Sequence, residues 1–124
     1  MAIYPKTINA FELNEWFNSE VENPIIIDVR EDMELNSASL PFTEIFIPMS
    51  KVSIELVVSE LGKYKKKNFV VLCHRGIRSY NFGQWLLDNN IVDEVWNLSD
   101  GIDGWSRDVD PNIPRYWIIE DSPF

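Results

Sequence analysis

Two short apolar runs, each apolar on both faces of an extended strand, most constrain the fold of this chain: Ile25-Ile26-Ile27 and Phe69-Val70-Val71-Leu72. Strands of this kind are typical of a parallel sheet that helices cover on both faces. Segments of helical period separate the runs, and strands that alternate with helices predict an α/β domain with a mainly parallel sheet.

Cap, turn and periodicity signals predict the remaining elements. These are a helix capped by Asn9, with Glu12 completing a capping box, that ends near Asn23-Pro24; a short helix and loop over 31–40; a strand over 45–47; a helix capped by Ser50 that ends at Gly62; a helix from Ser79 to Asn89-Asn90; a strand over 95–98; and a short helix with an irregular tail over 99–124.

Composition limits the classes of function. The 124 residues, 45% hydrophobic and 13% aromatic, suit one compact domain. The net charge of −9, from 11 Lys and Arg against 20 Asp and Glu, leaves no broad basic face for nucleic acid or an anionic membrane. The N-terminus does not resemble a signal peptide, and no apolar run approaches the ~18 residues of a membrane span. We expect a soluble, cytoplasmic protein.

The chain has one Cys and one His, which excludes an intramolecular disulfide and a zinc site of four Cys and His ligands. The sequence therefore predicts no metal and no cofactor, and any role of Cys73 is that of a thiol. Cys73 directly follows the 69–72 run. That position is the carboxyl end of a buried strand, where ligands bind in sheets of this kind.

The segment after this strand, Cys73-His74-Arg75-Gly76-Ile77-Arg78, combines features that stabilise negative charge. Gly76 permits a tight loop whose backbone N–H groups point inward, and the helix expected near Ser79 adds its positive end. Arg75 and Arg78 add full charges. These features favour the nucleophilic thiolate and an anionic substrate beside it. The alternative is a small buried Cys that only packs at a strand end.

With these residues, the sequence resembles the rhodanese-like sulfurtransferases, whose active-site loop is Cys-x-x-Gly-x-Arg. Further ordered similarities are Ile27-Asp28-Val29-Arg30-Glu31, Ile47-Pro48-Met49-Ser50, Asn97-Leu98-Ser99-Asp100-Gly101-Ile102-Asp103-Gly104-Trp105 and Pro114-Arg115-Tyr116. The resemblance implies a three-layer α/β fold in which helices flank a mainly parallel sheet of about five strands. It also implies a single domain over residues 1–124, with a core of about 8–117.

The resemblance implies a mechanism as well. Cys73 would take the sulfane sulfur of thiosulfate or a similar small anionic donor, hold it as a persulfide, and pass it to cyanide, a thiol or a carrier protein. The loop from His74 through Gly76 and Ile77 would bind the substrate with its backbone N–H groups. Arg78 first, and Arg75 second, would orient the anionic donor. The resemblance leaves the physiological donor and acceptor open.

Two departures from the family pattern accompany these matches. The family's Gly-His-Ile-Pro-Gly-Ala segment is Ala38-Ser39-Leu40-Pro41-Phe42-Thr43 here, so Ser39 replaces its His. Further on, Asp100 replaces the first Gly of a Gly-Gly pair and Gly104 replaces an Ala, which predicts an altered turn.

Several alternatives stay open. Phosphatase relatives of this fold have Arg six positions after Cys, whereas Arg78 is five positions after Cys73, and this spacing disfavours phosphatase chemistry. A persulfide relay or binding module without turnover remains an alternative to an enzyme. His74 either assists the thiolate or contacts the acceptor at the rim. Asp28 and Arg30 either line the site or, as we expect, form a structural pair that holds neighbouring loops. Ser79 is also expected to have a structural role near the site. Trp105 is expected in the core.

Overall fold

The computed structural model describes residues 2–64 and 67–118. Its elements in chain order are β1 (Lys6–Ile8), α1 (Ala10–Phe17), β2 (Ile25–Asp28), α2 (Asp32–Leu35), β3 (Ile45–Phe46), the 3-10 helix η1 (Met49–Lys51), α3 (Ile54–Leu61), β4 (Phe69–Leu72), α4 (Ile77–Asp88), β5 (Trp96–Leu98) and α5 (Gly101–Asp108). The strands form one five-stranded sheet in the order β1-β5-β4-β2-β3, and every pair is parallel. The predicted α/β class with a parallel sheet is confirmed.

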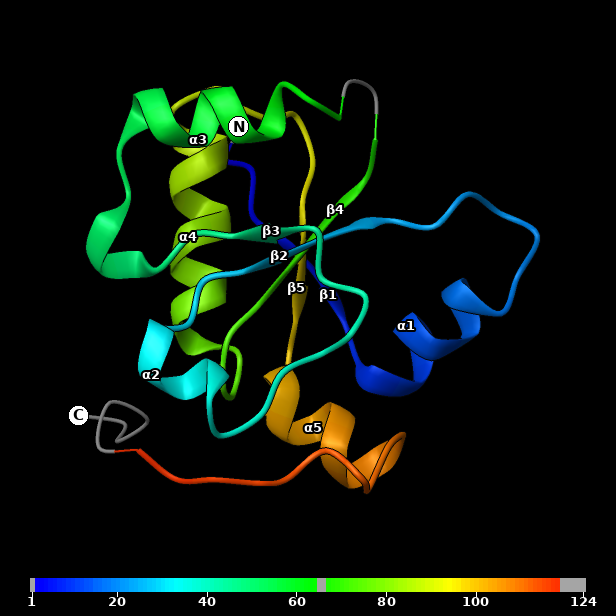
Figure 1. Ribbon diagram of the computed structural model, residues 1–124. Coiled ribbons are helices and arrows are strands. Elements are labelled where there is room, and N and C mark those ends of the chain that lie inside the picture. The colour runs from blue at the N-terminus through cyan, green and yellow to red at the C-terminus, as the bar shows by residue number, and fades with distance from the viewer. Residues whose placement is uncertain (1, 65–66, 119–124) are drawn as a thin grey trace.

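Helices cover both faces of the sheet and make three layers, with α3 and α4 on one side and α1 and α5 on the other (Figure 1). The central strand β4 is buried along its whole length because it supplies both cores. Val71 packs in one apolar cluster with Phe82 of α4. Val70 and Leu72 pack in the other cluster with Trp105 of α5, so Trp105 is a core residue as predicted.

Helix α1 begins as the sequence predicts but ends earlier. The Asn9 side chain accepts a hydrogen bond from the Glu12 N–H at 2.8 Å, and the Glu12 carboxylate accepts one from the Asn9 N–H at 2.9 Å. This capping box is confirmed. The predicted end near Asn23-Pro24 is wrong, because the helix ends at Phe17 and the Trp16 indole donates to the Glu22 carbonyl at 2.9 Å across the turn that follows.

The predicted cap of the next long helix is also wrong. Ser50 lies inside η1, which follows Pro48, and Ser53 is the residue that caps α3 by accepting from the Leu56 N–H at 3.2 Å. Both serines precede apolar residues of helical period, and the 3-10 turn after Pro48 moves the helix start by one turn. The helix ends before Gly62, as predicted.

Other elements also differ from the prediction. Strand β3 ends at Phe46, one residue before the predicted end at Ile47. Strand β1 was not predicted, because only Ile8 of its three residues is buried and its pattern is too short to stand out. Helix α4 begins at Ile77, two residues before the predicted start at Ser79, since Gly76 rather than a side-chain cap precedes it. Strand β5 begins at Trp96, one residue later than predicted.

The parallel register brings the carboxyl ends of β2, β4 and β5 to one edge of the sheet, where Asp28 lies beside Leu72. The loop after β4 and the helix α2 after β2 both lie at this edge (Figure 1). In residues 2–64 and 67–118, no helix is long and apolar enough to cross a membrane.

Candidate active site

Two glycines fix the path of the loop that follows β4. Gly76 has φ +97°, and a Cβ placed there would lie 2.1 Å from the carbonyl oxygen of Ser99. Gly101 has φ +59°, and a Cβ there would lie 2.3 Å from the carbonyl oxygen of His74. Both positions therefore require glycine for conformation and for space. The loop of Cys73 and the turn between β5 and α5 consequently pack backbone against backbone.

Cys73 lies at the start of this loop, and 1% of its surface is exposed. Its Sγ accepts a hydrogen bond from the backbone N–H of Gly76 at 3.1 Å and lies 3.3 Å from the hydroxyl of Ser79. Donors aimed at sulfur are the contacts that a thiolate accepts. The structure thus brings Cys73, Gly76 and Ser79 together in one turn.

Asn97 lies behind this turn and was not predicted as a site residue. Its Oδ1 is 2.5 Å from the Ser79 hydroxyl, and its Nδ2 donates to the Gly76 carbonyl at 3.0 Å. Asn97 begins a segment that is similar to the family pattern, and it is a polar residue in an otherwise apolar strand, 6% exposed. Its partners lie 18 and 21 positions away, so spacing along the chain does not reveal them.

Arg78 is held by a carboxylate from α2. Its Nη1 and Nη2 donate to the two oxygens of Glu34 at 2.7 and 2.8 Å, and 15% of its side chain is exposed. Burial alone would raise the pKa of Glu34, but the hydrogen bonds from Arg78 and from the Glu31 N–H outweigh burial and lower the pKa. Glu34 was not singled out in the sequence, because it lies 44 positions from its partner.

Asp28 and Arg30 form a fully buried ion pair beside these residues, as the sequence predicts. Arg30 Nη2 lies 2.7 Å from an Asp28 oxygen, and Nη1 donates to the Ala38 carbonyl at 2.8 Å. Burial disfavours the charged guanidinium, yet the hydrogen bonds and charge of Asp28 prevail, and the pKa of Arg30 is raised. The pair holds β2 against the loop that begins at Ala38.

Tyr116, from the C-terminal segment, joins the charged residues to His74. Its hydroxyl accepts from Arg30 Nη1 at 3.1 Å and donates to Glu34 Oε1 at 3.0 Å. Burial raises the pKa of this hydroxyl and so keeps it protonated. Its ring stacks on the His74 ring, with centroids 4.0 Å apart and planes 15° apart.

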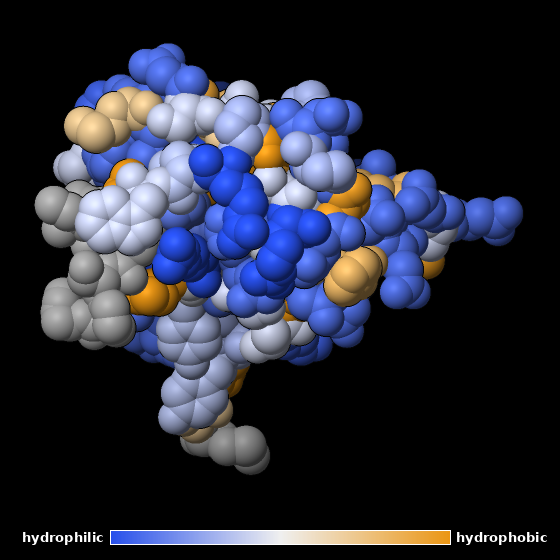
Figure 2. Space-filling model, turned by 90° about the horizontal axis from the view of Figure 1, so that it is seen from below, coloured by the Kyte–Doolittle hydropathy of each residue, from blue (hydrophilic) through white to orange (hydrophobic). Residues whose placement is uncertain are grey.

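The predicted position of His74 at the rim is wrong, because the whole residue is buried. Burial also lowers the pKa of His74 and favours the neutral ring. Arg75 and Ile77 are the exposed residues of the loop. In Figure 2, strongly hydrophilic side chains gather at the centre of the face at this end of the molecule.

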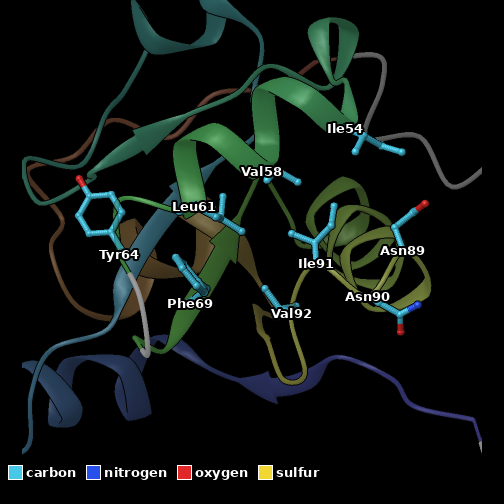
Figure 3. Close-up of a pocket in the computed structure, with 10 residues that line it drawn as sticks. Ile54, Val58, Leu61, Tyr64, Phe69, Asn89, Asn90, Ile91 and Val92 are labelled. Atoms are coloured by element: carbon cyan, nitrogen blue, oxygen red, sulfur yellow. The ribbon is translucent and has the colours of Figure 1, made fainter.

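A cavity of about 460 Å³ lies at the other end of the strands, between α3 and the turn that precedes β5 (Figure 3). Its lining includes Ile54, Val58, Phe69 and Ile91, and it contains no residue of the Cys73 loop. Among the described residues, no three His, Cys, Asp or Glu side chains are grouped so that they could hold a metal ion. The candidate site is therefore the loop itself.

Comparison with known proteins agrees with this geometry. The family model described as Rhodanese-like domain matches residues 12–108. The chain belongs to the rhodanese-like domain family.

Two relatives are longer than this chain. Rhodanese-like/PpiC domain-containing protein 12, chloroplastic, of Arabidopsis thaliana is 34% identical over 110 residues, which are 82% of this chain and 36% of that protein. Adenylyltransferase and sulfurtransferase UBA4 of Debaryomyces hansenii is 31% identical over 116 residues, 88% of this chain and 25% of that protein. The solved rhodanese-like domain protein of Staphylococcus aureus has a TM-score of 0.65 and 25% identity, and the match covers 90% of this chain and 99% of that one.

Two of the departures from the family pattern, at Phe42 and Gly104, have packing explanations. In the rhodanese-like domain described here, Phe42 stands where the family has Gly, and its ring contacts Phe17 and Trp105 with centroids 4.7 and 5.2 Å away. At the other departure, a Cβ on Gly104 would lie 2.4 Å from the Cβ of Asp100. The replacement of the family's Ala by Gly at 104 therefore leaves room for the Asp100 side chain.

Proposed function

We propose that this chain is a sulfurtransferase that carries a sulfane sulfur as a persulfide on Cys73. The hydrogen-bond environment of Cys73 Sγ supports this most directly. The sulfur faces the Gly76 N–H and the Ser79 hydroxyl in a loop of the family's Cys-x-x-Gly-x-Arg form. We propose thiosulfate or a similar small anion as the donor, and cyanide, a thiol or a carrier protein as the acceptor.

The proposed reaction has two steps, loading of the sulfur onto Cys73 and its discharge to the acceptor. The Cys73 thiolate attacks the outer sulfur of thiosulfate, an S–S bond forms, and the bond to the sulfonate sulfur breaks and releases sulfite with its electron pair. The negative charge then rests on the outer sulfur of the persulfide. The acceptor attacks that outer sulfur, and the charge returns to Sγ as the thiolate. No external oxidant or reductant is consumed, and Cys73 acts as nucleophile first and leaving group second.

Backbone N–H groups of residues 74–78 would bind the persulfide and the oxygens of the donor. The geometry suggests a division of roles between the two arginines. Arg78 is paired with Glu34 through both Nη atoms, whereas Arg75 is exposed. We propose that Arg75 contacts the donor and that Arg78 shapes the loop and adds charge from behind it. A cytoplasmic location, where thiols stay reduced, would suit this chemistry.

The test is intact-mass analysis after thiosulfate treatment, followed by a thiocyanate assay with cyanide. Wild type should gain one sulfur atom and form thiocyanate, and Cys73→Ser should do neither. The chain contains one Cys, so a gain that persists in Cys73→Ser would refute persulfide formation at this site.

A persulfide relay is the second candidate, because the two relatives described above are longer proteins of which this chain matches 36% and 25%. A relay would gain the sulfur atom but turn over no thiosulfate with cyanide. Release of phosphate from an aryl phosphate that is lost in Cys73→Ser would contradict both candidates.

A further inference from the structure

Ser79 has one hydroxyl proton and two acceptors for it. Its Oγ lies 2.5 Å from Asn97 Oδ1 and 3.3 Å from Cys73 Sγ. Ser79 is completely buried and Asn97 is 6% exposed, so bulk water is kept from this row of three polar groups. A buried hydroxyl beside a sulfur that gains and loses charge can respond to that charge.

The orientation of Asn97 determines which way the proton points at rest. Its amide nitrogen lies 3.0 Å from the Gly76 carbonyl, which can only accept a hydrogen bond. Oδ1 therefore faces Ser79, and because Oδ1 carries no hydrogen, Ser79 must donate across the 2.5 Å contact. The lone pairs of the Ser79 oxygen then face Cys73, where a protonated thiol can donate to them.

Ionisation of Cys73 removes that hydrogen and places a negative sulfur against the same lone pairs. The favourable response is rotation of the Ser79 hydroxyl from Asn97 toward Sγ, since a hydrogen bond to a charged acceptor is about twice as strong as one between neutral groups. We propose that Ser79 is a catalytic residue whose hydroxyl turns to donate to Sγ whenever charge is on that sulfur and returns to Asn97 when charge leaves it.

This inference rests on the proposed persulfide chemistry and adds an order of events to it. The hydroxyl donates to Sγ in the free thiolate. It returns to Asn97 when the S–S bond forms, because the charge then sits on the outer sulfur. It turns again as the acceptor breaks the S–S bond and Sγ becomes the leaving group. Ser79 therefore assists discharge of the sulfur more than loading.

Ionisation of Cys73 also responds to charges on every element around the loop. The charged and titratable groups there are His74, Arg75 and Arg78 of the loop and α4, Asp28 and Arg30 at the end of β2, Glu34 of α2, Asp103 of α5, and Arg115 and Tyr116 of the C-terminal segment. All of them are kept when Ser79 is substituted. A difference between Ser79 variants thus isolates the hydroxyl.

The experiment is a pH titration of the ultraviolet thiolate absorbance of the free protein, with Cys73→Ala as the blank. Because the chain has one Cys, the signal reports one group. Ser79→Ala should move the midpoint up by about one to two pH units, the effect of a hydrogen bond to a charged acceptor. Ser79→Thr, which keeps a hydroxyl, should restore most of the shift.

Ser106→Ala is the matched control. Ser106 is a serine of α5, 2% exposed, whose hydroxyl donates to the Ile113 carbonyl in the segment that follows the helix. Its loss should leave the midpoint unchanged. A Ser79→Ala midpoint equal to that of wild type, or a shift of the same size in Ser106→Ala, would overturn the inference.

A second measurement follows the two half-reactions separately. Discharge of the persulfide to a small thiol should slow about tenfold in Ser79→Ala, with loading at saturating thiolate little changed. The titration needs no sulfur transfer, so the two proposals fail separately. A shifted midpoint without persulfide formation would refute only the sulfurtransferase function, and sulfur transfer with an unshifted midpoint would refute only the role of Ser79.

Discussion

Gly104 and Asp100 should be energetically coupled, and a double-mutant cycle measures the coupling. Both residues depart from the family pattern, and the space for a Cβ at 104 is occupied by the Cβ of Asp100, 2.4 Å away. That atom is bonded to the backbone at the start of α5, so it cannot rotate away. Carbon atoms ordinarily pack at about 3.5–4.0 Å, and relief of the overlap requires a shift of the helix start.

The effect of Gly104→Ala on the free energy of unfolding should change sign when Asp100 is replaced by Gly. In a helix interior, Gly→Ala stabilises by about 0.8–1.0 kcal/mol. Overpacking at a fixed site costs about 1–3 kcal/mol. Gly104→Ala in wild type should therefore be neutral or destabilising by up to about 2 kcal/mol, and the same change in Asp100→Gly should stabilise by about 1 kcal/mol.

Urea denaturation of the four proteins, followed by tryptophan fluorescence, gives the free energies of unfolding. The coupling energy should be about 1–3 kcal/mol, well above the few tenths expected for independent sites. Additive effects of the two substitutions would refute the packing explanation. The Asp100–Arg107 ion pair at 3.1 Å is lost in both the Asp100→Gly variant and the double variant, so its contribution cancels from the cycle.

Three further predictions concern the site. Gly76→Ala places a side chain at φ +97° and 2.1 Å from the Ser99 oxygen. It should lower the free energy of unfolding by at least ~2 kcal/mol in urea denaturation and abolish persulfide formation in intact-mass analysis. Wild-type behaviour in both measurements would contradict the loop geometry. Tyr116→Phe keeps the stack on His74 but removes the hydroxyl that donates to Glu34. It should lower the free energy of unfolding by about 1.5–3 kcal/mol, and an unchanged urea midpoint would contradict this expectation. Burial lowers the pKa of His74 below its ordinary 6.5, so the unfolded chain takes up a proton that the folded chain does not. Stability should fall by up to about 1.4 kcal/mol per pH unit as the pH drops from 6.5 toward the folded pKa, and a His74→Gln variant that keeps this drop in urea midpoints would contradict the assignment.

Local patterns predicted the parts of this molecule that depend on local interactions. The apolar run of β4 identified a central strand, and the Asn9 capping box identified the start of α1. Gly76 indicated a tight loop, since a residue with φ +97° must be glycine in a turn this crowded. Strand β1 lacked such a signal, because it is held by pairing with β5 at the other end of the chain.

The residues that sequence reasoning missed act through distant partners. Glu34 bonds Arg78 across 44 positions and Tyr116 across 82 positions, and the parallel topology alone brings these segments to one edge. A Glu in a polar stretch and a Tyr in a proline-rich tail have ordinary surface explanations in the sequence. Only the crossing of chain segments at the carboxyl ends of the strands gives each of them a buried partner.

The same pairing changes what the arginines near Cys73 can do. The sequence presents Arg75 and Arg78 as a positive site within a chain of net charge −9. In the structure, Arg78 is matched to Glu34, and two further arginines are matched to carboxylates, Arg30 to Asp28 and Arg115 to Asp103. Paired charges hold a backbone in place but contribute a weak net field, so in the proposed reaction the attraction of a doubly charged donor would fall to the backbone N–H groups and to exposed Arg75. We infer that the loop would bind the proposed donor mainly through its shape, which the two glycines and the ion pairs maintain.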